Sequence, residues 1–230
     1  MGYSLYDFTE TLARIGQVKD RTGEDYRKYA FFPEKDELKQ CKGAYVDGIA
    51  IASRLVFVAR DIDLLTIAKV YEMFLTEARA IMTVTSAFRD VSVDGHIFRG
   101  LYNIENDDFF NEVLDIAGRL ISLSDVINTK LGRRNNPIIT SMCAIDFGTM
   151  FVANVDDNLI YSGNMCTRIE GYIIKPLKEE VKKGIFITEK FYGKLKDDYK
   201  AFFNKVVEES KVYYGSVENI GMSRWVKEQE

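Results

Sequence analysis

The chain has one histidine, His96, and this limits the chemistry that its 230 residues could carry out. A serine–histidine–aspartate triad would need this histidine, and the sequence contains no GxSxG motif. A zinc site with several histidines cannot form, and no cluster of cysteines replaces them. The phosphate-binding patterns GxxxxGK[ST] and GxGxxG are also absent. An enzyme with this sequence would therefore depend on carboxylates, a metal ion and a substrate that carries its own nucleophile.

The composition narrows the class of protein further. A hydrophobic content of 47% is enough for a full core, and the length favours one domain. With 31 basic and 35 acidic residues, the net charge of −4 argues against binding to nucleic acid. Three cysteines without a CxxC pair predict a reducing, cytoplasmic location. The most apolar stretch, residues 43–59, contains Asp47 and Arg54, so we expect no membrane span.

The elements that would position the carboxylates follow a β-α-β-β-α-β-β order. The Asp94-Gly95 pair between two apolar runs predicts a hairpin, and the 3.6-residue periodicity of apolar residues predicts two long helices. The predicted elements are a strand at 43–51, a helix at 64–82, strands at 88–93 and 97–102, a helix at 109–131, and a hairpin of strands at 138–147 and 150–154 that breaks at Gly148. The first six match the ferredoxin-like βαββαβ arrangement, an α+β fold with an antiparallel sheet.

Further elements are predicted on either side of this core. Residues 1–39 are interpreted as an N-terminal helical lead-in, and residues 40–230 as the main domain. C-terminal helices are expected at 164–174, at 189–195 after the cap residue Thr188, and at 199–207, with a strand at 185–187.

Several segments in this order together carry a family resemblance. They are Gly43-Ala-Tyr-Val-Asp47, Thr66-Ile-Ala-Lys-Val-Tyr71, Val93-Asp-Gly-His-Ile-Phe-Arg-Gly-Leu-Tyr102, Ile145-Asp-Phe-Gly148, Tyr161-Ser-Gly-Asn-Met-Cys-Thr-Arg168, Tyr213-Tyr-Gly-Ser-Val217 and Met222-Ser-Arg-Trp225. Over residues 36–227 the chain resembles a class III nucleotidyl cyclase domain, and more narrowly the bacterial Pycsar-type pyrimidine cyclases of anti-phage defence.

The resemblance implies a defined reaction and assembly. The ribose 3′-hydroxyl of a nucleoside triphosphate attacks the α-phosphate, pyrophosphate leaves, and a 3′,5′-cyclic nucleotide forms for a downstream effector. Two divalent ions held by two aspartates would activate the hydroxyl and bind the phosphates. An asparagine and a cationic side chain would come from the partner subunit, so the resemblance implies a homodimer.

The family's functional positions match this sequence poorly. Asp47 matches the first metal aspartate, but the second metal position falls on His96, with Asp94 two residues away as a weak substitute. Thr167 stands at the position of the ribose-orienting asparagine, and Gly171 at that of the cation, a job that Arg168 could take over. Gly48 and Asn164 remain as nucleotide contacts. These changes predict one ion, Mn²⁺ or Mg²⁺, rather than two, with Mn²⁺ favoured because it tolerates an imidazole ligand better.

Each of these residues also has an ordinary structural interpretation. Asp47 with Gly48 is typical of a turn at a strand end, His96 of a hairpin, and Arg168 of a solvated helix face. Two functions from different classes therefore stay open. One is a cyclase with a degenerate site and weak or absent activity, and the other is a pseudo-cyclase that binds a nucleotide or a protein partner and regulates it.

Overall fold

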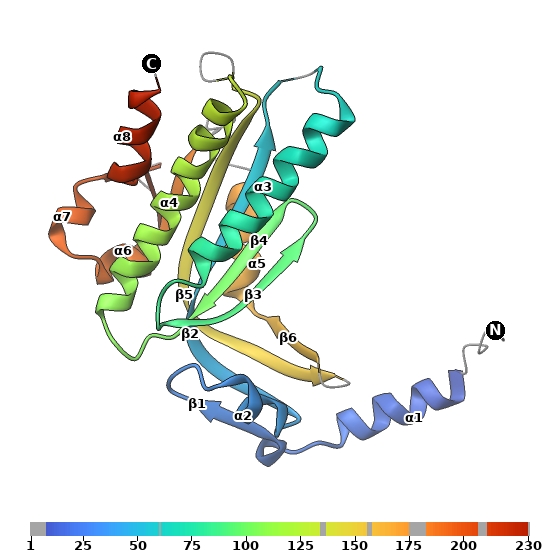
Figure 1. The fold of residues 1–230 in the computed structure, drawn as a ribbon. Coiled ribbons are helices and arrows are strands. Elements are labelled where there is room, and N and C mark those ends of the chain that lie inside the picture. The colour runs from blue at the N-terminus through green and yellow to red at the C-terminus, as the bar shows by residue number, and fades with distance from the viewer. Residues whose placement is uncertain are drawn as a thin grey trace.

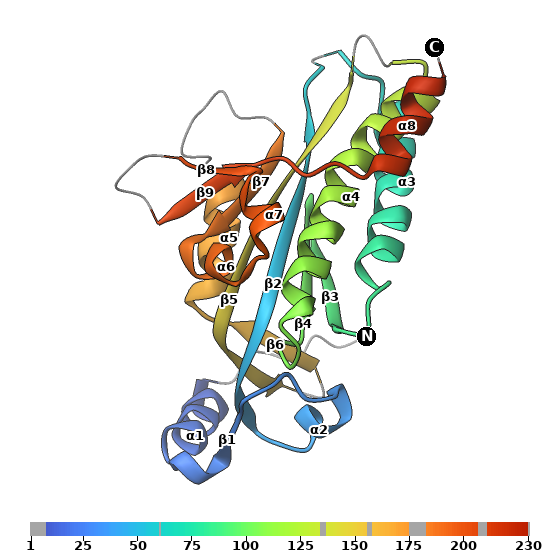
Figure 2. The same cartoon turned by 90° about the vertical axis from the view of Figure 1, so that its left-hand side faces the viewer.

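The computed structural model describes residues 8–59, 61–133, 137–155, 158–174, 183–206 and 211–229. Within these residues one nine-stranded sheet runs through the molecule, with its main path in the order β3-β4-β2-β5-β7-β9-β8. Helices α3 and α4 cover one face of the sheet and α5 covers the other (Figures 1 and 2).

The central unit is the ferredoxin-like arrangement that the sequence predicts. Its elements are β2 (Gly43–Phe57), α3 (Leu64–Met82), β3 (Phe88–Asp94), β4 (Ile97–Tyr102), α4 (Asp108–Lys130) and β5 (Ile139–Val155). The strand pairs β3–β4, β4–β2 and β2–β5 are all antiparallel. Gly95 has a φ of 58° in the turn between β3 and β4, which is a conformation that glycine adopts at low cost. The predicted α+β fold class is confirmed.

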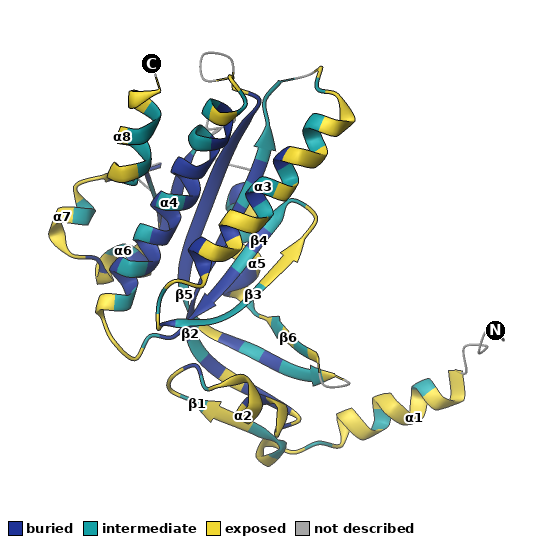
Figure 3. Ribbon diagram, in the orientation of Figure 1, coloured by how far each residue is buried: buried dark blue, intermediate teal, exposed yellow. Residues whose placement is uncertain are grey.

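The larger core lies between the sheet and helices α3 and α4. Side chains alternate along β2, so Ile49, Ile51 and Leu55 face these helices. There they pack in the same core as Phe74 of α3 and Leu120 of α4, all of which are buried. Figure 3 shows this burial in α4 and along the middle of β2 and β5. The apolar stripes read from the sequence therefore point into this core.

Two strands are longer than their sequence patterns indicate. The strand expected at 43–51 continues to Phe57, because β5 pairs with β2 over its whole length, from Gly43 opposite Ala153 to Phe57 opposite Ile139. The predicted hairpin at Gly148 is wrong. Gly148 has a φ of 154° but stays paired with Gly48, so Ile139–Val155 forms one strand, β5.

The second layer lies on the opposite face. Helix α5 (Asn164–Ile174) packs Met165, Ile169 and Ile173 against even-numbered residues of β2 and β5. Strand β7 (Gly184–Thr188) runs parallel to β5 and continues into α6 (Glu189–Lys194), whose N-cap is Thr188 as predicted. The helix expected at 199–207 is wrong: α7 covers only Asp197–Lys200 and β8 (Phe203–Lys205) follows, paired with β9 (Val212–Gly215). Helix α8 (Ile220–Glu228) then packs on α4.

The N-terminal segment extends the sheet at one end. It contains α1 (Phe8–Lys19), a 3-10 turn (Gly23–Asp25), β1 (Tyr26–Tyr29) and α2 (Lys35–Lys39). Strand β1 pairs in parallel with the start of β2, and β6 (Asn158–Ser162) pairs with the end of β5. At this end Phe32 and Leu38 are buried against the α5 side of the sheet. None of the helices in the described residues has the length and apolar character needed to cross a membrane.

Candidate functional site

Asp47 lies on β2 at the open end of the sheet, beyond the helices of the main core. It is half-buried, and its Oδ1 accepts a hydrogen bond of 2.5 Å from the hydroxyl of Thr149, its register partner on β5. Together with Lys28, Tyr29 and Tyr45 these two residues line an open depression of about 460 Å³. Asp47 can therefore reach solvent, and one carboxylate with one hydroxyl is a weak ligand set for a hard cation.

His96 and Asp94 lie far from Asp47, in the β3–β4 hairpin. The carbonyl of His96 accepts a hydrogen bond from the amide of Leu55, which is eight residues after Asp47 on the same strand. At about 3.3 Å per residue, the two sites are about 26 Å apart. The interpretation in which Asp47, His96 and Asp94 share one ion within a chain is wrong, because β2 is longer than its local pattern indicates and its far end pairs with the hairpin.

The part of β2 beside the hairpin carries a cation, Arg54. Arg54 lies opposite Ile97, and its Nη1 donates to the carbonyls of Ile173 and Ile174 at the C-terminal end of α5, at 3.0 and 3.2 Å. Arg99 of β4 faces the same side and forms an ion pair with Glu170 of α5. No group of three metal-ligating side chains occurs within the residues that the structure describes. Arginines are bound by anions and carbonyls, so this corner is electrostatically opposite to a metal site.

Two carboxylates follow β2 on the way to α3. Asp63 accepts hydrogen bonds from the amide and hydroxyl of Thr66, at 2.9 and 2.7 Å, and so caps α3. These hydrogen bonds hold the pKa of Asp63 below its usual value. Asp61 is exposed. Asp63, and not Asp61, is therefore the N-cap of α3.

The predicted residues of α5 point in different directions. Asn164 and Thr167 are exposed, and the hydroxyl of Thr167 donates to the carbonyl of Gly163 at 3.4 Å. Arg168 instead reaches down to the sheet and donates its Nε to Oδ2 of Asp146 at 2.9 Å, with a second bond from Nη2. Adjacent helix positions are about 100° apart, so Thr167 and Arg168 do not act on one ligand atom within a chain.

Asp146 is the charged residue that sequence reasoning missed. It lies on β5 with no exposed surface, and its Oδ1 also accepts hydrogen bonds from the hydroxyl of Thr188 at 2.5 Å and from the amide of Phe147 at 2.9 Å. A buried carboxylate is stable only when it is paired in this way. The signal was present in the sequence as an aspartate inside the apolar run 144–147, which was interpreted only as a family motif.

Gly48 follows Asp47 on β2 and is buried on the α5 side of the sheet. A Cβ atom at this position would come within 2.9 Å of the carbonyl of Tyr102 and 3.0 Å of the ring of Phe32. Glycine is therefore needed here for the close approach of neighbouring segments, which is a packing requirement.

The cysteines are not available for nucleophilic chemistry. Cys41, Cys143 and Cys166 are all buried and free. Burial raises the pKa of Cys143 to about 12, and burial also raises the pKa of Cys166. A thiolate, the reactive form, is therefore disfavoured at neutral pH at both positions.

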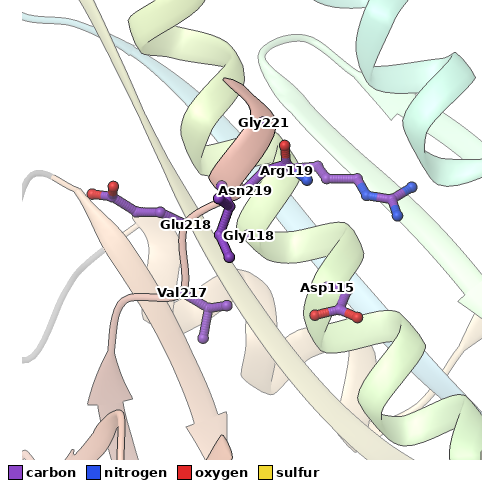
Figure 4. A pocket seen from close by; sticks show the side chains of 8 residues that line it. Asp115, Gly118, Arg119, Val217, Glu218, Asn219 and Gly221 are labelled. Carbon is purple, nitrogen blue, oxygen red and sulfur yellow. The ribbon is translucent and has the colours of Figure 1, made fainter. Parts of the chain in front are cut away.

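A second depression, of about 230 Å³, lies where α4 meets residues 217–221 (Figure 4). Its charged residues do not converge: Figure 4 shows Arg119 and Glu218 pointing away from each other. Asp115 accepts hydrogen bonds from Tyr199 at 3.0 and 3.1 Å, and burial together with this carboxylate raises the pKa of Tyr199 to about 12. Asn219 caps α8. The polar groups at this position hold the C-terminal segment on α4.

Comparison with known proteins identifies the fold. No protein-family model matches the chain, and no curated protein matches it. Among solved structures, a crystal structure of the guanylyl cyclase Cya2 superimposes with a TM-score of 0.58 at 12% identity, covering 77% of this chain and 94% of the chain in that structure. A double mutant of the guanylyl cyclase domain of the RhoGC fusion protein from the aquatic fungus Blastocladiella emersonii, in a monomeric crystal structure, gives a TM-score of 0.60 at 12% identity and covers 78% and 99%.

A third structure is the catalytic core of a rhodopsin-guanylyl cyclase with converted specificity in complex with ATPalphaS. It gives a TM-score of 0.54 at 11% identity and covers 77% of this chain and 99% of that core. At these identities the comparison establishes the fold: the chain has the fold of class III guanylyl and adenylyl cyclase domains.

Proposed function

We propose that this protein is a nucleotidyl cyclase homologue with a degenerate site, whose isolated chain has weak or absent cyclase activity. The observation that carries the proposal is the corner where β2 meets the β3–β4 hairpin. It combines a cyclase-type fold with Arg54, Arg99 and His96 around the hairpin, while Asp47, the residue matched to the first metal aspartate, lies about 26 Å away along β2. A nucleoside triphosphate is the proposed ligand, since one structure of the same fold is in complex with ATPalphaS.

The residues present do not fit the two divalent ions that the cyclase resemblance implies. Asp47 and Thr149 could hold one ion weakly at the open end of the sheet, and His96 and Asp94 could supplement only an ion at the hairpin. Neither set offers the several carboxylate oxygens that Mg²⁺ or Mn²⁺ prefers. The described residues therefore do not support a catalytic step through two metal ions.

The remaining parts of the proposal come from the resemblance. Pyrimidine triphosphates are the proposed substrates, anti-phage signalling through a cyclic-nucleotide effector is the proposed role, and a homodimer is the proposed assembly. Three buried, free cysteines support a reducing, cytoplasmic location.

A cyclase assay tests this proposal. Purified protein is incubated with each of the four nucleoside triphosphates and Mn²⁺ or Mg²⁺, and cyclic product and pyrophosphate are measured. The loss of a metal carboxylate and of a ribose-orienting group is expected to reduce turnover by about ten-thousandfold if the two act independently, and by less if they act as a unit. We expect product near background. Robust turnover by the natural sequence would contradict the proposal.

Variants locate any residual activity. His96→Asp with Thr167→Asn should raise it, because these changes restore family residue types at the hairpin and on α5. Asp47→Ala and Asp61→Ala form a matched pair. The family resemblance predicts that Asp47 matters, whereas Asp61 lies after the end of β2 that pairs with the hairpin. Loss of activity only in Asp61→Ala would move the metal position from Asp47 to Asp61.

A regulatory pseudo-cyclase is the second candidate. It is favoured by the internal use of Arg168, which is bound to Asp146 and is not free to stabilise charge in a reaction. Thermal unfolding with a nucleoside triphosphate, in the presence of EDTA and then of Mn²⁺, distinguishes the two candidates. A stabilisation without metal and without product supports the regulatory module.

A further inference from the structure

Two surfaces of this chain expose large apolar side chains. One is the α1 stripe, which consists of Phe8, Leu12, Ile15 and Val18, with exposed fractions between 49% and 63%. Their spacing places them within about 120° of arc on one side of the helix. Within the described part of the chain α1 buries none of its residues, and Figure 1 shows it extending away from the body. A helix of 12 residues is marginal in water unless its apolar side is covered.

The other surface is the open sheet face, formed by Tyr26, Tyr45, Phe151, Val155 and Ile160 on strands β1, β2, β5 and β6. These strands bury Val46, Met150 and Val152 on their other side, so register places the five residues together on the opposite side. Tyr45, Val155 and Ile160 are 42%, 48% and 51% exposed.

Aromatic rings form the middle of the open sheet face. The ring of Phe151 lies 5.3 Å from that of Tyr45 and 5.8 Å from that of Tyr26. Gly43 lies beneath them, where a Cβ atom would come within 2.9 Å of both Phe151 and Tyr26. These rings therefore form a packed apolar platform of the kind that a helix covers elsewhere in the same sheet, and the depression at Asp47 and Thr149 lies beside it on the same side of the sheet.

The connection between the two surfaces argues that α1 does not cover its own sheet. Residues 20–25 are fixed by hydrogen bonds: the amide of Asp20 donates to Gly16, and Thr22 and Asp25 form a capping box with an amide-to-carboxylate bond of 2.8 Å. Strand β1 follows immediately. The ordered residues 20–25 therefore direct α1 away from the open sheet face, although α1 ends close to the edge of that face.

We propose that the α1 stripe of one copy of this chain packs on the open sheet face of a second copy, and that the exchange is reciprocal. A two-fold dimer covers both the α1 stripe and the open sheet face of each copy. Seven side chains of the two surfaces are more than 40% exposed: the four of the α1 stripe, and Tyr45, Val155 and Ile160 of the open sheet face. With roughly 90 Å² of exposed surface on each, two symmetric contacts remove on the order of 1,200 Å² from water. This area is at the lower end of the range for specific protein interfaces. A contact between two α1 helices alone would offer fewer than two heptads.

The inference assigns an interface to the proposed homodimer. It does not depend on whether the chain makes a cyclic nucleotide, and its test measures which residues form the contact. Light scattering after size exclusion is performed between about 1 and 100 µM on the natural chain, on Leu12→Asp with Ile15→Asp, and on Tyr45→Glu with Ile160→Glu. Each pair should raise the dimer dissociation constant at least about a hundredfold, because each puts charge into an apolar contact. The matched control is Leu64→Asp with Leu65→Asp, two exposed residues at the start of α3 that lie outside both surfaces; it should leave the dimer unchanged.

A cysteine pair identifies the occupant. Ile15→Cys in one tagged copy and Ile160→Cys in a differently tagged copy should form an intermolecular disulfide in a mixture, since the natural cysteines are buried. Circular dichroism checks that each variant stays folded. A monomer at 100 µM, a dimer indifferent to both pairs, or a disulfide that forms only within one chain carrying both cysteines would overturn the proposal.

Discussion

The same pair of side chains, an aspartate and a threonine, occurs in two very different regions of this molecule. Asp146 accepts the Thr188 hydroxyl in the middle of the sheet, and Asp47 accepts the Thr149 hydroxyl at its open end, both at 2.5 Å. Asp146 has no exposed surface and is also bound by Arg168, whereas Asp47 is half-buried beside an open depression. The comparison teaches that the surroundings decide whether a strand aspartate stabilises the fold or stays available to a ligand.

The difference arises from the position of α5. This helix crosses β2 and β5 above Asp146 and brings Arg168 onto the carboxylate. At the other end of the strands Tyr45, Asp47 and Thr149 are on the opposite side of the sheet, where no described helix lies over them. In the protein interior, where the dielectric constant is low, the loss of any hydrogen-bond or ion-pair partner of a charge lowers stability. Near solvent, water replaces a lost partner.

The largest effect is expected from Arg168→Leu. It would leave the buried Asp146 without its cation. Because the Arg168 side chain is itself 42% exposed, the expected cost is about 3 kcal/mol of unfolding free energy, the lower end of the range for breaking a buried pair. Urea denaturation measures the change. The matched control is Arg79→Leu on α3, which lies outside the cluster. A change below about 1 kcal/mol for Arg168→Leu would show that the pair does not hold α5 on the sheet.

Thr188→Val removes the hydroxyl that binds Asp146 and so compares the buried aspartate with Asp47 through one hydrogen bond each. We expect a loss of about 1–3 kcal/mol, because Asp146 loses a buried donor and α6 loses its N-cap. Thr149→Val removes the equivalent hydroxyl from Asp47, where water can replace it, and should cost clearly less. Equal losses in the two variants would remove the proposed distinction between the regions.

Asp63→Ala tests a third aspartate–threonine pair, at the exposed start of α3. The pKa of Asp63 is lowered in the folded state by hydrogen bonds from Thr66, so its contribution to stability is present above the unfolded pKa of about 4 and is lost as the pH falls through the folded pKa. The natural chain should therefore be more stable than the variant at pH 7, with a smaller difference than in the buried cluster. The difference between the two denaturation midpoints should shrink as the pH falls below about 4; a difference that stays constant would contradict the lowered pKa of Asp63.

The smallest stability effect is expected from Asp47→Asn. A half-buried carboxylate with one hydroxyl partner should contribute within about 0.5 kcal/mol, since the amide keeps an acceptor for Thr149. The same variant should abolish any stabilisation of the chain by Mn²⁺ in a thermal melt. A large loss of stability without metal would show that Asp47 has a structural role like that of Asp146.

Local patterns in the sequence determined the central fold. Helical periodicity placed α3 at its observed bounds, residues 64–82, and the Asp94-Gly95 turn with its flanking strands placed the β3–β4 hairpin. The sequence also predicted Thr188 as the N-cap of α6, which the structure confirms. These features depend on residues a few positions apart, whose propensities and hydrogen bonds are set before any long-range contact forms.

The tertiary structure alone decided the site. Pairing with β5 extended β2 to Phe57 and moved the hairpin from the expected neighbourhood of Asp47 to that of Leu55. The packing of α5 turned Arg168 inward to Asp146, while Thr167 stayed exposed. Strand length and register come from partners about a hundred residues away, and the direction of a side chain comes from the surface on which its helix lies. No local pattern contains either quantity, which is why the residue types could be named from the sequence and their meeting points could not.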